Sequence, residues 1–299
     1  MTESITVRVP AKVNVQLAVG AARPDGFHDL ANVFLAVSLY DEVTATPADR
    51  LRITCSGPDA GQVPLDASNL AARAAVALAD RHGIAPDVHL HIAKDIPVAG
   101  GMAGGSADGA GALLACDALW NTGASRDELL DICAELGSDV PFSLIGGAAL
   151  GTGRGERLTP LEVGSAFHWV FAVADGGLST PAVYGEFDRL TAGTDVPPPA
   201  AAPALLDALR TGDATALAGA LANDLQPAAL SLRPSLADTL AAGTGAGALA
   251  GLVSGSGPTT AFLVKDADAA DAVAAALLAS GTCRTARVAT SPAPGATVV

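Results

Sequence analysis

A glycine-rich segment, Pro97-Val-Ala-Gly-Gly-Met-Ala-Gly-Gly-Ser-Ala-Asp108, carries the clearest chemical signal in the sequence. It follows Val88-His-Leu-His-Ile92, which alternates apolar and polar residues as a half-buried strand does. It leads into residues 107–119, which are rich in alanine and leucine and contain no proline, as in a helix. A helix that begins in a glycine loop presents unpaired backbone N–H groups and the positive end of its dipole, and both favour phosphate. The sequence therefore predicts a phosphate site here.

Two common phosphate-binding motifs do not fit this segment. No Gly-x-x-x-x-Gly-Lys-[Ser/Thr] occurs in the chain, so the segment is not a Walker A loop. A dinucleotide fingerprint is disfavoured because the segment comes late and no clear second βαβ unit follows it. A flexible turn with a tight helix entry is the simple alternative. Ser106 at the helix start and Asp108, which we expect inside the first turn, weigh against that alternative.

Two polar side chains lie two residues apart in Pro10-Ala-Lys-Val-Asn14. On a strand, this spacing points Lys12 and Asn14 to the same face. An ammonium and an amide that project together could hold a phosphate or a hydroxyl. An exposed strand face explains the pattern equally well.

A second glycine loop, Ser254-Gly-Ser-Gly-Pro-Thr-Thr260, lies between two apolar stretches. Its flanks are too apolar for a linker, and its small residues indicate close approach of the backbone to a ligand. A simple hairpin connection is the alternative.

Asp139 lies in Leu136-Gly-Ser-Asp-Val-Pro-Phe142, just past the end of an expected helix. A carboxylate there would face the negative end of the helix dipole, which is unfavourable unless a cation is near. This misfit suggests function, and a solvent-exposed loop aspartate is the simple alternative.

The elements that must position these groups follow from periodicity and turn chemistry. We expect strands at residues 5–9, 13–17, 33–39, 42–46, 51–55, 88–92, 148–151, 168–174, 248–253, 259–264 and 284–289. We expect helices at residues 69–81 (with Ser68 as N-cap), 107–119, 126–136 (opened by the capping box Ser125-Arg-Asp-Glu128), 181–190, 203–211, 214–221, 233–242 and 267–278. The proline-rich segment 197–203 is expected to be an exposed linker. This mixture predicts an α+β fold in both halves, with a boundary near residues 159–165.

Composition narrows the class of protein. The 299 residues suffice for two domains, and half of them are hydrophobic. The net charge of −14 argues against a nucleic-acid or anionic-membrane partner, so an anionic ligand needs a local positive site. The cysteines show no metal-ligand spacing, and Cys116 and Cys133 are expected in the core. With no signal peptide and no apolar run of about 18 residues, we expect a soluble cytoplasmic protein.

Taken together, the motifs resemble those of the GHMP kinase family. Residues 10–14, 97–108 and 254–260 resemble its three motifs, in family order and at family spacing. The resemblance implies a two-domain fold with the active site in the cleft between the domains. Residues 1–160 would form an α/β ATP-binding domain, and residues 161–299 a ferredoxin-like α+β domain.

Four shorter segments resemble one branch of this family: residues 23–28, 136–141, 151–156 and 179–184. This resemblance implies an ATP- and Mg²⁺-dependent kinase that phosphorylates the 2-hydroxyl of a cytidylyl methylerythritol in the non-mevalonate route to isoprenoids. It assigns Asp139 as the general base and Lys12 as the charge stabiliser. It implies no clear set of Mg²⁺ ligands, and the sequence predicts no oligomeric state.

The resemblance also assigns the binding residues. Those expected around ATP are Asn69, Lys94, Pro97, Gly100, Gly101, Gly104, Gly105 and Ser106. Those expected around the acceptor substrate are Asn14, Phe27, His28, Tyr184, Gly255 and Ser256. His28 would bind the cytosine edge, while Phe27 and Tyr184 would stack on its faces.

The second motif departs from the family pattern at Ala103 and Ala107. Alanine disfavours a positive φ at residue 103, and residue 107 lacks a hydroxyl. We therefore expect backbone N–H groups to provide most of the phosphate binding. The alternatives are a homoserine or mevalonate-pathway kinase, a catalytically silent nucleotide-binding protein and, more remotely, a Rossmann dehydrogenase.

Overall fold

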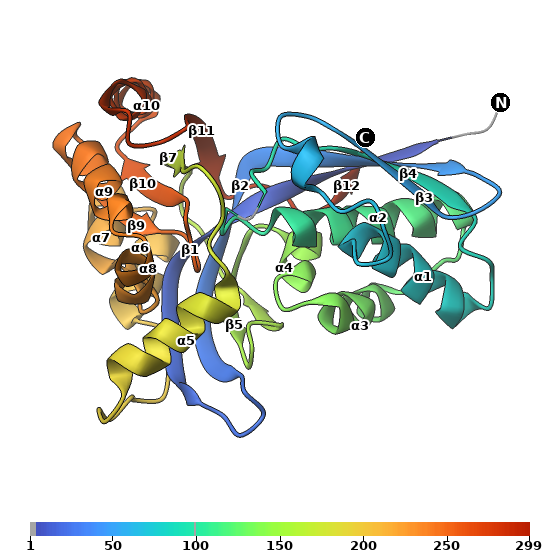
Figure 1. Ribbon diagram of the computed structural model, residues 1–299, viewed down its shortest axis with the longest axis horizontal. Coiled ribbons are helices and arrows are strands. Elements are labelled where there is room, and N and C mark those ends of the chain that lie inside the picture. The colour runs from blue at the N-terminus through green and yellow to red at the C-terminus, as the bar shows by residue number, and fades with distance from the viewer. Residues whose placement is uncertain (1–3, 99) are drawn as a thin grey trace.

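Two long antiparallel strands run through the centre of the molecule, in a computed structural model that describes residues 4–98 and 100–299 (Figure 1). They are β1 (Ile5–Ala22) and β2 (His28–Pro47), joined by a turn at residues 23–27. Each replaces two shorter expected strands. β1 continues through Pro10 because the register shifts between Pro10 and Ala11, where the ladder tolerates a residue without an N–H.

These strands belong to an eight-stranded sheet with the central order β12-β1-β2-β4-β3. The other strands of this sheet are β3 (Arg52–Ser56), β4 (Val88–Ala93), β5 (Ala148–Thr152), β6 (Arg157–Pro160), β8 (Ala222–Asn223) and β12 (Thr297–Val298). Its helical elements are η1 (Ala60–Gln62), α1 (Leu70–His82), α2 (Gly104–Trp120), α3 (Arg126–Leu136) and α4 (Val140–Ile145). Helices α1 to α4 lie together on one side of the sheet (Figure 1).

Helix α2 packs closely on the two central strands. Most of its side chains are buried, and Gly111 lies so near the sheet that a Cβ there would be 2.7 Å from Val9 Cγ2. Cys116 on this helix and Cys133 on α3 are buried in the core, as predicted. The close packing fixes where the N-terminus of α2 meets the strand residues of the site.

The second half of the chain forms a four-stranded sheet of order β11-β7-β10-β9 with helices around it. Its strands are β7 (Phe167–Val173), β9 (Ala250–Val253), β10 (Thr260–Val264) and β11 (Thr285–Ser291). Its helices are α5 (Thr180–Thr191), α6 (Pro203–Thr211), α7 (Ala214–Ala220), α8 (Gln226–Leu232), α9 (Ser235–Gly245) and α10 (Ala267–Ser280). The α+β prediction is confirmed.

The two halves of the chain are interleaved at their edges. β6 and β7 lie in different sheets on either side of residues 161–166, yet β8 and β12 return to pair with β1. The proline-rich segment 197–202 has no helix or strand, as expected, but it is fixed against β1. Gln16 donates to the Ala200 carbonyl at 2.8 Å and accepts from the Ala202 N–H at 2.8 Å.

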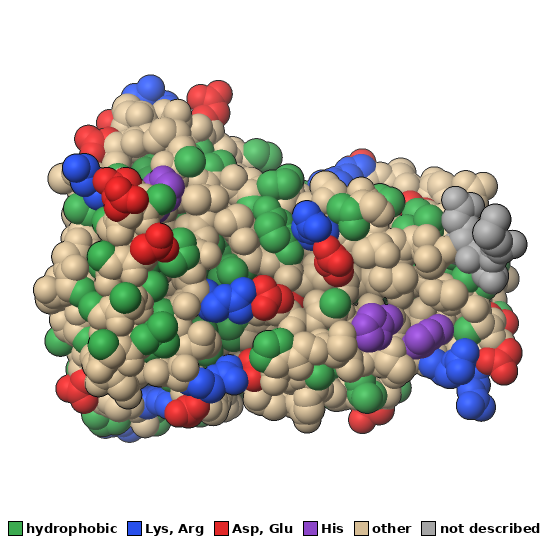
Figure 2. All heavy atoms as spheres, turned by 90° about the horizontal axis from the view of Figure 1, so that it is seen from above, with side chains coloured by type: hydrophobic (Ala, Val, Ile, Leu, Met, Phe, Trp, Pro, Cys, Tyr) green, Lys and Arg blue, Asp and Glu red, His purple; other side chains and the backbone are tan. Residues whose placement is uncertain are grey.

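No helix in the described part of the chain is both long enough and apolar enough to cross a bilayer. Figure 2 shows acidic and basic side chains scattered over one face rather than gathered into a single patch. The predicted cytoplasmic location stays a prediction.

Candidate active site

A cavity of about 780 Å³ lies between the two halves of the chain. Its wall comes from β1, β2, the start of α2, the residues before α4, helix α5 and the loop between β9 and β10. Thirteen of the sixteen predicted site residues line it: Lys12, Asn14, Phe27, His28, Gly100, Gly101, Gly104, Gly105, Ser106, Asp139, Tyr184, Gly255 and Ser256. Segments far apart in the sequence therefore meet at one place, as the motifs predicted.

The Lys12 ammonium lies at the centre of the polar contacts in this cavity. It donates to Asn14 Oδ1 at 2.6 Å and to the Gly101 carbonyl at 2.9 Å, and it lies 3.6 Å from Asp139 Oδ2. The prediction that Lys12 and Asn14 share a face is confirmed, and the exposed-face alternative is wrong because both side chains are buried. Burial lowers the pKa of Lys12, and the Asp139 carboxylate partly opposes this shift.

Asp139 lies between two helix ends, just past α3 as expected and directly before α4. It is the N-cap of α4, and only three residues separate the end of α3 from the start of α4. The cation that this position requires is present, since Lys12 Nζ lies 3.6 Å from the carboxylate, and the N-terminus of α4 also favours a negative charge. The side chain makes no capping hydrogen bond and is 32% exposed. Its carboxylate is thus free to face Lys12 and a ligand.

The glycine loop contacts the Lys12 side chain through the Gly101 carbonyl. Gly101 adopts a φ of +76°, and its carbonyl accepts hydrogen bonds from Lys12 Nζ and, at 3.1 Å, from Ser254 Oγ. Helix α2 then begins at Gly104, so Gly104, Gly105 and Ser106 form its first turn beside the cavity. The backbone N–H groups of a first turn have no acceptor within their own helix. These N–H groups lie where we expect phosphate to bind, and that role stays a prediction.

Ala103, the residue before α2, has a φ of 61° and a ψ of 30°. The expectation that alanine would avoid a positive φ here is wrong. An L-residue with a Cβ loses about 1–2 kcal/mol in this left-handed conformation. The loop keeps its shape in spite of this residue because its neighbours are fixed by Lys12 and Ser254.

The second glycine loop, residues 254–260, closes the cavity from the other sheet. It is buried throughout, and it connects the antiparallel strands β9 and β10, as the hairpin alternative predicted. Close approach of its backbone to a ligand stays a prediction. A Cβ on Gly255 would lie 3.2 Å from Asn14 Oδ1 and 3.3 Å from Lys12 Nζ. Ser256 Oγ lies 2.9 Å from Thr180 Oγ1 at the start of α5. The loop therefore approaches the Lys12 and Asn14 side chains through its backbone.

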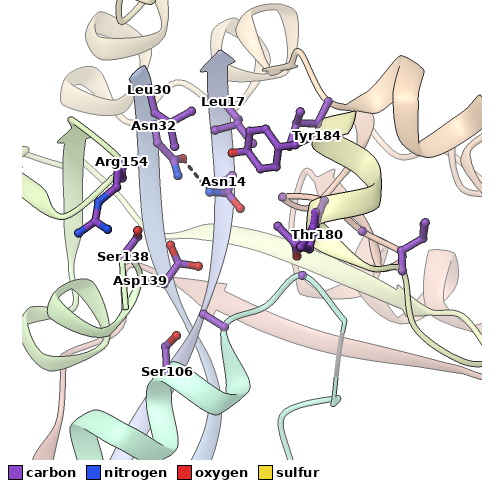
Figure 3. Close-up of a pocket in the computed structure, with 18 of the residues that line it drawn as sticks. Asn14, Leu17, Leu30, Asn32, Ser106, Ser138, Asp139, Arg154, Thr180 and Tyr184 are labelled. Atoms are coloured by element: carbon purple, nitrogen blue, oxygen red, sulfur yellow. Dashed lines mark hydrogen bonds between the residues drawn. The ribbon is translucent and has the colours of Figure 1, made fainter. Parts of the chain in front are cut away.

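Figure 3 shows that Asn14 and Asn32 extend toward each other from neighbouring strands. Asn14 Nδ2 donates to Asn32 Oδ1 at 2.7 Å, and both side chains are buried. Sequence reasoning missed Asn32, although its place opposite Leu17 in the β1–β2 ladder could have revealed it once the pairing was known. The hydrogen bond fixes which end of the Asn14 amide faces Lys12.

A group of rings forms the far end of the cavity. The buried His28 ring lies 5.0 Å from the Tyr184 ring, tilted by 32°, and meets the edge of Phe187. Burial raises the pKa of Tyr184, and the Asp139 charge adds to this. Phe27 is 48% exposed, with the Arg154 guanidinium 5.1 Å from its ring centroid.

Lys94 lies outside the large cavity, in a buried ionic cluster. Its ammonium contacts Asp41 Oδ2 at 2.5 Å and Asp108 Oδ2 at 2.8 Å. The placement of Asp108 in the first turn of α2 is wrong, since it is the fifth residue of the helix. Burial raises the pKa of Asp108 to about 7 against the opposing charge of Lys94, and the nearby Asp41 carboxylate adds to the rise.

The other two predicted nucleotide residues also lie outside the cavity wall. Asn69, not Ser68, is the N-cap of α1, accepting from the Ala71 N–H at 2.8 Å and donating to the Pro64 carbonyl at 2.7 Å. Ser68 instead bonds to Asp66. Pro97 is buried at the entry to the glycine loop. Contacts of Asn69, Lys94 and Pro97 with a nucleotide stay predictions.

Among residues 4–98 and 100–299, no cluster of three or more histidine, cysteine or acidic side chains could hold a metal ion. The Ser106 hydroxyl and the Asp139 carboxylate both line the cavity. Mg²⁺ in phosphate-binding sites commonly takes one or two protein oxygens together with substrate phosphates. The residues present fit a magnesium ion of that kind, carried mainly by a nucleotide.

Comparisons with known proteins agree with this architecture. Residues 69–147 match the family described as GHMP kinases N terminal domain, and residues 205–282 match GHMP kinases C terminal. A Streptomyces avermitilis protein named 4-diphosphocytidyl-2-C-methyl-D-erythritol kinase is 84% identical over 296 residues, covering 99% of this chain and 100% of that protein. The chain belongs to the GHMP kinase family.

Other relatives of this GHMP kinase extend the comparison. A protein of the same name from Thermobifida fusca is 60% identical, with 99% of this chain and 98% of that protein covered. A crystal structure of 4-(cytidine 5'-diphospho)-2C-methyl-D-erythritol kinase superposes with a TM-score of 0.78 at 32% identity, covering 96% and 99% of the two chains. Homoserine kinase from Cytophaga hutchinsonii shares the fold, with a TM-score of 0.72 at 21% identity over 100% and 98% of the chains.

Replacing Ala103 by glycine should stabilise the protein. Glycine adopts positive φ without the Cβ penalty, so we expect Ala103→Gly to raise the free energy of unfolding by about 0.5–1 kcal/mol in urea denaturation. Ala107→Gly, inside α2, is the matched control and should lower it. Destabilisation by both substitutions would contradict the account of Ala103.

Asp108 should make stability depend on pH. The pKa of an unfolded aspartate is about 3.9, below the folded value of about 7, so the folded protein keeps a proton that the unfolded chain releases. The contribution of this proton to the free energy of unfolding is complete below pH 4 and is lost as the pH rises through 7. Asp108→Asn mimics the protonated acid, so its free energy of unfolding should rise relative to the parent by about 1–3 kcal/mol between pH 5 and pH 8.

The same substitution at Asp131, an exposed residue of α3, is the control for this titration. The difference in free energy of unfolding between Asp131→Asn and the parent protein should stay constant from pH 5 to pH 8. A constant difference between Asp108→Asn and the parent from pH 5 to pH 8 would contradict the raised pKa.

Proposed function

We propose that this GHMP kinase transfers the γ-phosphoryl group of ATP to the 2-hydroxyl of 4-diphosphocytidyl-2-C-methyl-D-erythritol, in the non-mevalonate route to isoprenoids. The observation that carries the proposal is the single cavity that joins the glycine loop, the Lys12 and Asp139 pair, and the rings around His28. The names of the highly identical relatives support it. The chain would divide functionally into residues 1–160 and 161–299.

Asp139 is the proposed general base. Its partly exposed carboxylate accepts the proton of the 2-hydroxyl as that oxygen forms a bond to the γ-phosphorus. The bond between the γ-phosphorus and the bridging oxygen breaks, and ADP leaves with the electron pair. Lys12, 3.6 Å from Asp139 Oδ2, places a positive charge beside this carboxylate and stabilises charge on the transferred group.

The donor nucleotide would bind along the glycine loop and the first turn of α2. The backbone N–H groups of Gly104, Gly105 and Ser106 face the phosphates, in accord with the loss of a hydroxyl at Ala107. A bound Mg²⁺ would supply positive charge to the phosphate oxygens, and the Ser106 hydroxyl is the protein oxygen at the start of α2 that could hold it. Asn69, Lys94 and Pro97 complete the proposed nucleotide surroundings.

The acceptor would bind across β1, β2 and α5. Phe27 and Tyr184 provide ring faces for stacking, and His28 provides polar ring atoms for the edge of the base. Asn14 and the backbone of Gly255 and Ser256 lie close to Lys12, where the reacting hydroxyl must be placed. A homoserine kinase with the same fold would have no need of this group of rings.

A substrate panel tests the proposal directly. Purified protein with Mg·ATP is incubated with the cytidylyl substrate, homoserine or mevalonate, and ADP release is followed. We expect turnover with the cytidylyl substrate alone. Turnover of homoserine or mevalonate without the cytidylyl substrate would overturn the substrate assignment, and ATP binding without any ADP release would indicate a silent nucleotide-binding protein.

Removing the base should abolish most of the turnover. Asp139→Asn keeps the size of the side chain but cannot accept the proton, so we expect kcat to fall by about 10²-fold or more. Asp238→Asn, at an exposed position in the first turn of α9, is the control and should keep the parental rate. A kcat for Asp139→Asn within about threefold of the parent would refute the assignment of the base.

A further inference from the structure

His28 has a partner that neither the motifs nor the proposed mechanism uses. Its Nε2 lies 2.8 Å from Asp188 Oδ1, on helix α5. The His28 side chain is 5% exposed and the Asp188 side chain 44% exposed, and both residues line the cavity. The two residues are 160 positions apart, so only the fold brings them together.

Packing fixes the plane of the His28 ring. Tyr184 lies on one side with its centroid 5.0 Å away, and Phe187 meets the ring edge-on with its centroid 5.9 Å away. Both belong to the helix that carries Asp188, so one element supplies the stack and the hydrogen bond. Rotation of the ring about the Cβ–Cγ bond of His28 would move Nε2 away from Asp188 and break this contact.

The carboxylate also determines which ring nitrogen carries the proton. An ionised carboxylate only accepts hydrogen bonds, so Nε2 must be the protonated nitrogen of the neutral ring. Nδ1 then holds a lone pair, and no described residue donates to it. A lone pair at Nδ1 accepts from a base that presents an amino group and repels one that presents a carbonyl.

We propose that Asp188 is a positioning residue that holds His28 as the Nε2–H tautomer and thereby makes the site select cytosine over uracil. At the relevant ring position cytosine carries an amino donor, whereas uracil carries a carbonyl acceptor. The inference rests on the proposed function, since it names how the same site chooses its base. It assigns no direct contact between Asp188 and the substrate.

The test compares the cytidylyl substrate with 4-diphosphouridyl-2-C-methyl-D-erythritol as a synthetic probe. For the parent protein we expect a strong preference in kcat/KM for the cytidylyl compound. In Asp188→Ala this preference should fall by about 10–100-fold, the effect expected from removal of a hydrogen bond to a charged group. The loss should appear in the KM for the cytidylyl substrate, with its kcat and the KM for ATP within about threefold of the parental values.

Glu186→Ala is the matched control, because it removes a carboxylate from the same helix. Glu186 pairs with Arg189 and Ser231 rather than with His28. We expect this variant to keep the parental preference for cytosine. An equal loss in both variants would mean that the helix itself was disturbed, and the inference would be wrong.

A second measurement tests the tautomer without any turnover. ¹⁵N NMR of histidine-labelled protein, assigned with a His28→Gln variant, should show His28 protonated at Nε2 only, and Asp188→Ala should shift proton occupancy toward Nδ1. Retention of both the tautomer and the base preference in Asp188→Ala would overturn the inference. Failure of the proposed function is distinguishable, because the parent would then turn over neither substrate while the NMR result still reports on Asp188.

Discussion

The site depends on one buried ammonium group. Lys12 is removed from water in the middle of a strand, and such a charge is tolerated only when polar partners surround it. Its partners come from three separate segments: Asn14 on the same strand, the Gly101 carbonyl in the glycine loop and the Asp139 carboxylate before α4. The ammonium therefore brings together the loop that would bind the donor and the carboxylate that would act on the acceptor.

The rest of the fold makes this arrangement possible. The long β1–β2 pair presents Lys12, Asn14 and Asn32 on adjoining strands, and α2 packs on that pair closely enough to bring its first turn beside them. From the other sheet, the loop containing Gly255 approaches through backbone alone, because a side chain there would crowd Lys12 and Asn14. Neither half of the chain contains the complete site.

Patterns within the sequence predicted much of this structure. The two-residue spacing of Lys12 and Asn14, the N-cap at Ser125 and the alternation before the glycine loop all reflect local rules that the structure confirms. Prediction failed where the deciding interaction is distant. The six-residue helix after Asp139 has no periodic signal of its own, and the pairing of Lys94 with Asp41, 53 positions earlier, is invisible along the chain.

The central claim is that Lys12 and Asp139 act as one unit. It is tested most directly by comparing kcat for Lys12→Met, Asp139→Asn and the double variant under saturating substrates. When two groups act as one unit, either substitution alone already removes their joint contribution to kcat. The double variant should therefore be no slower than the slower single variant, within about threefold. Multiplication of the two single losses in the double variant would show that the residues act independently and would contradict the account.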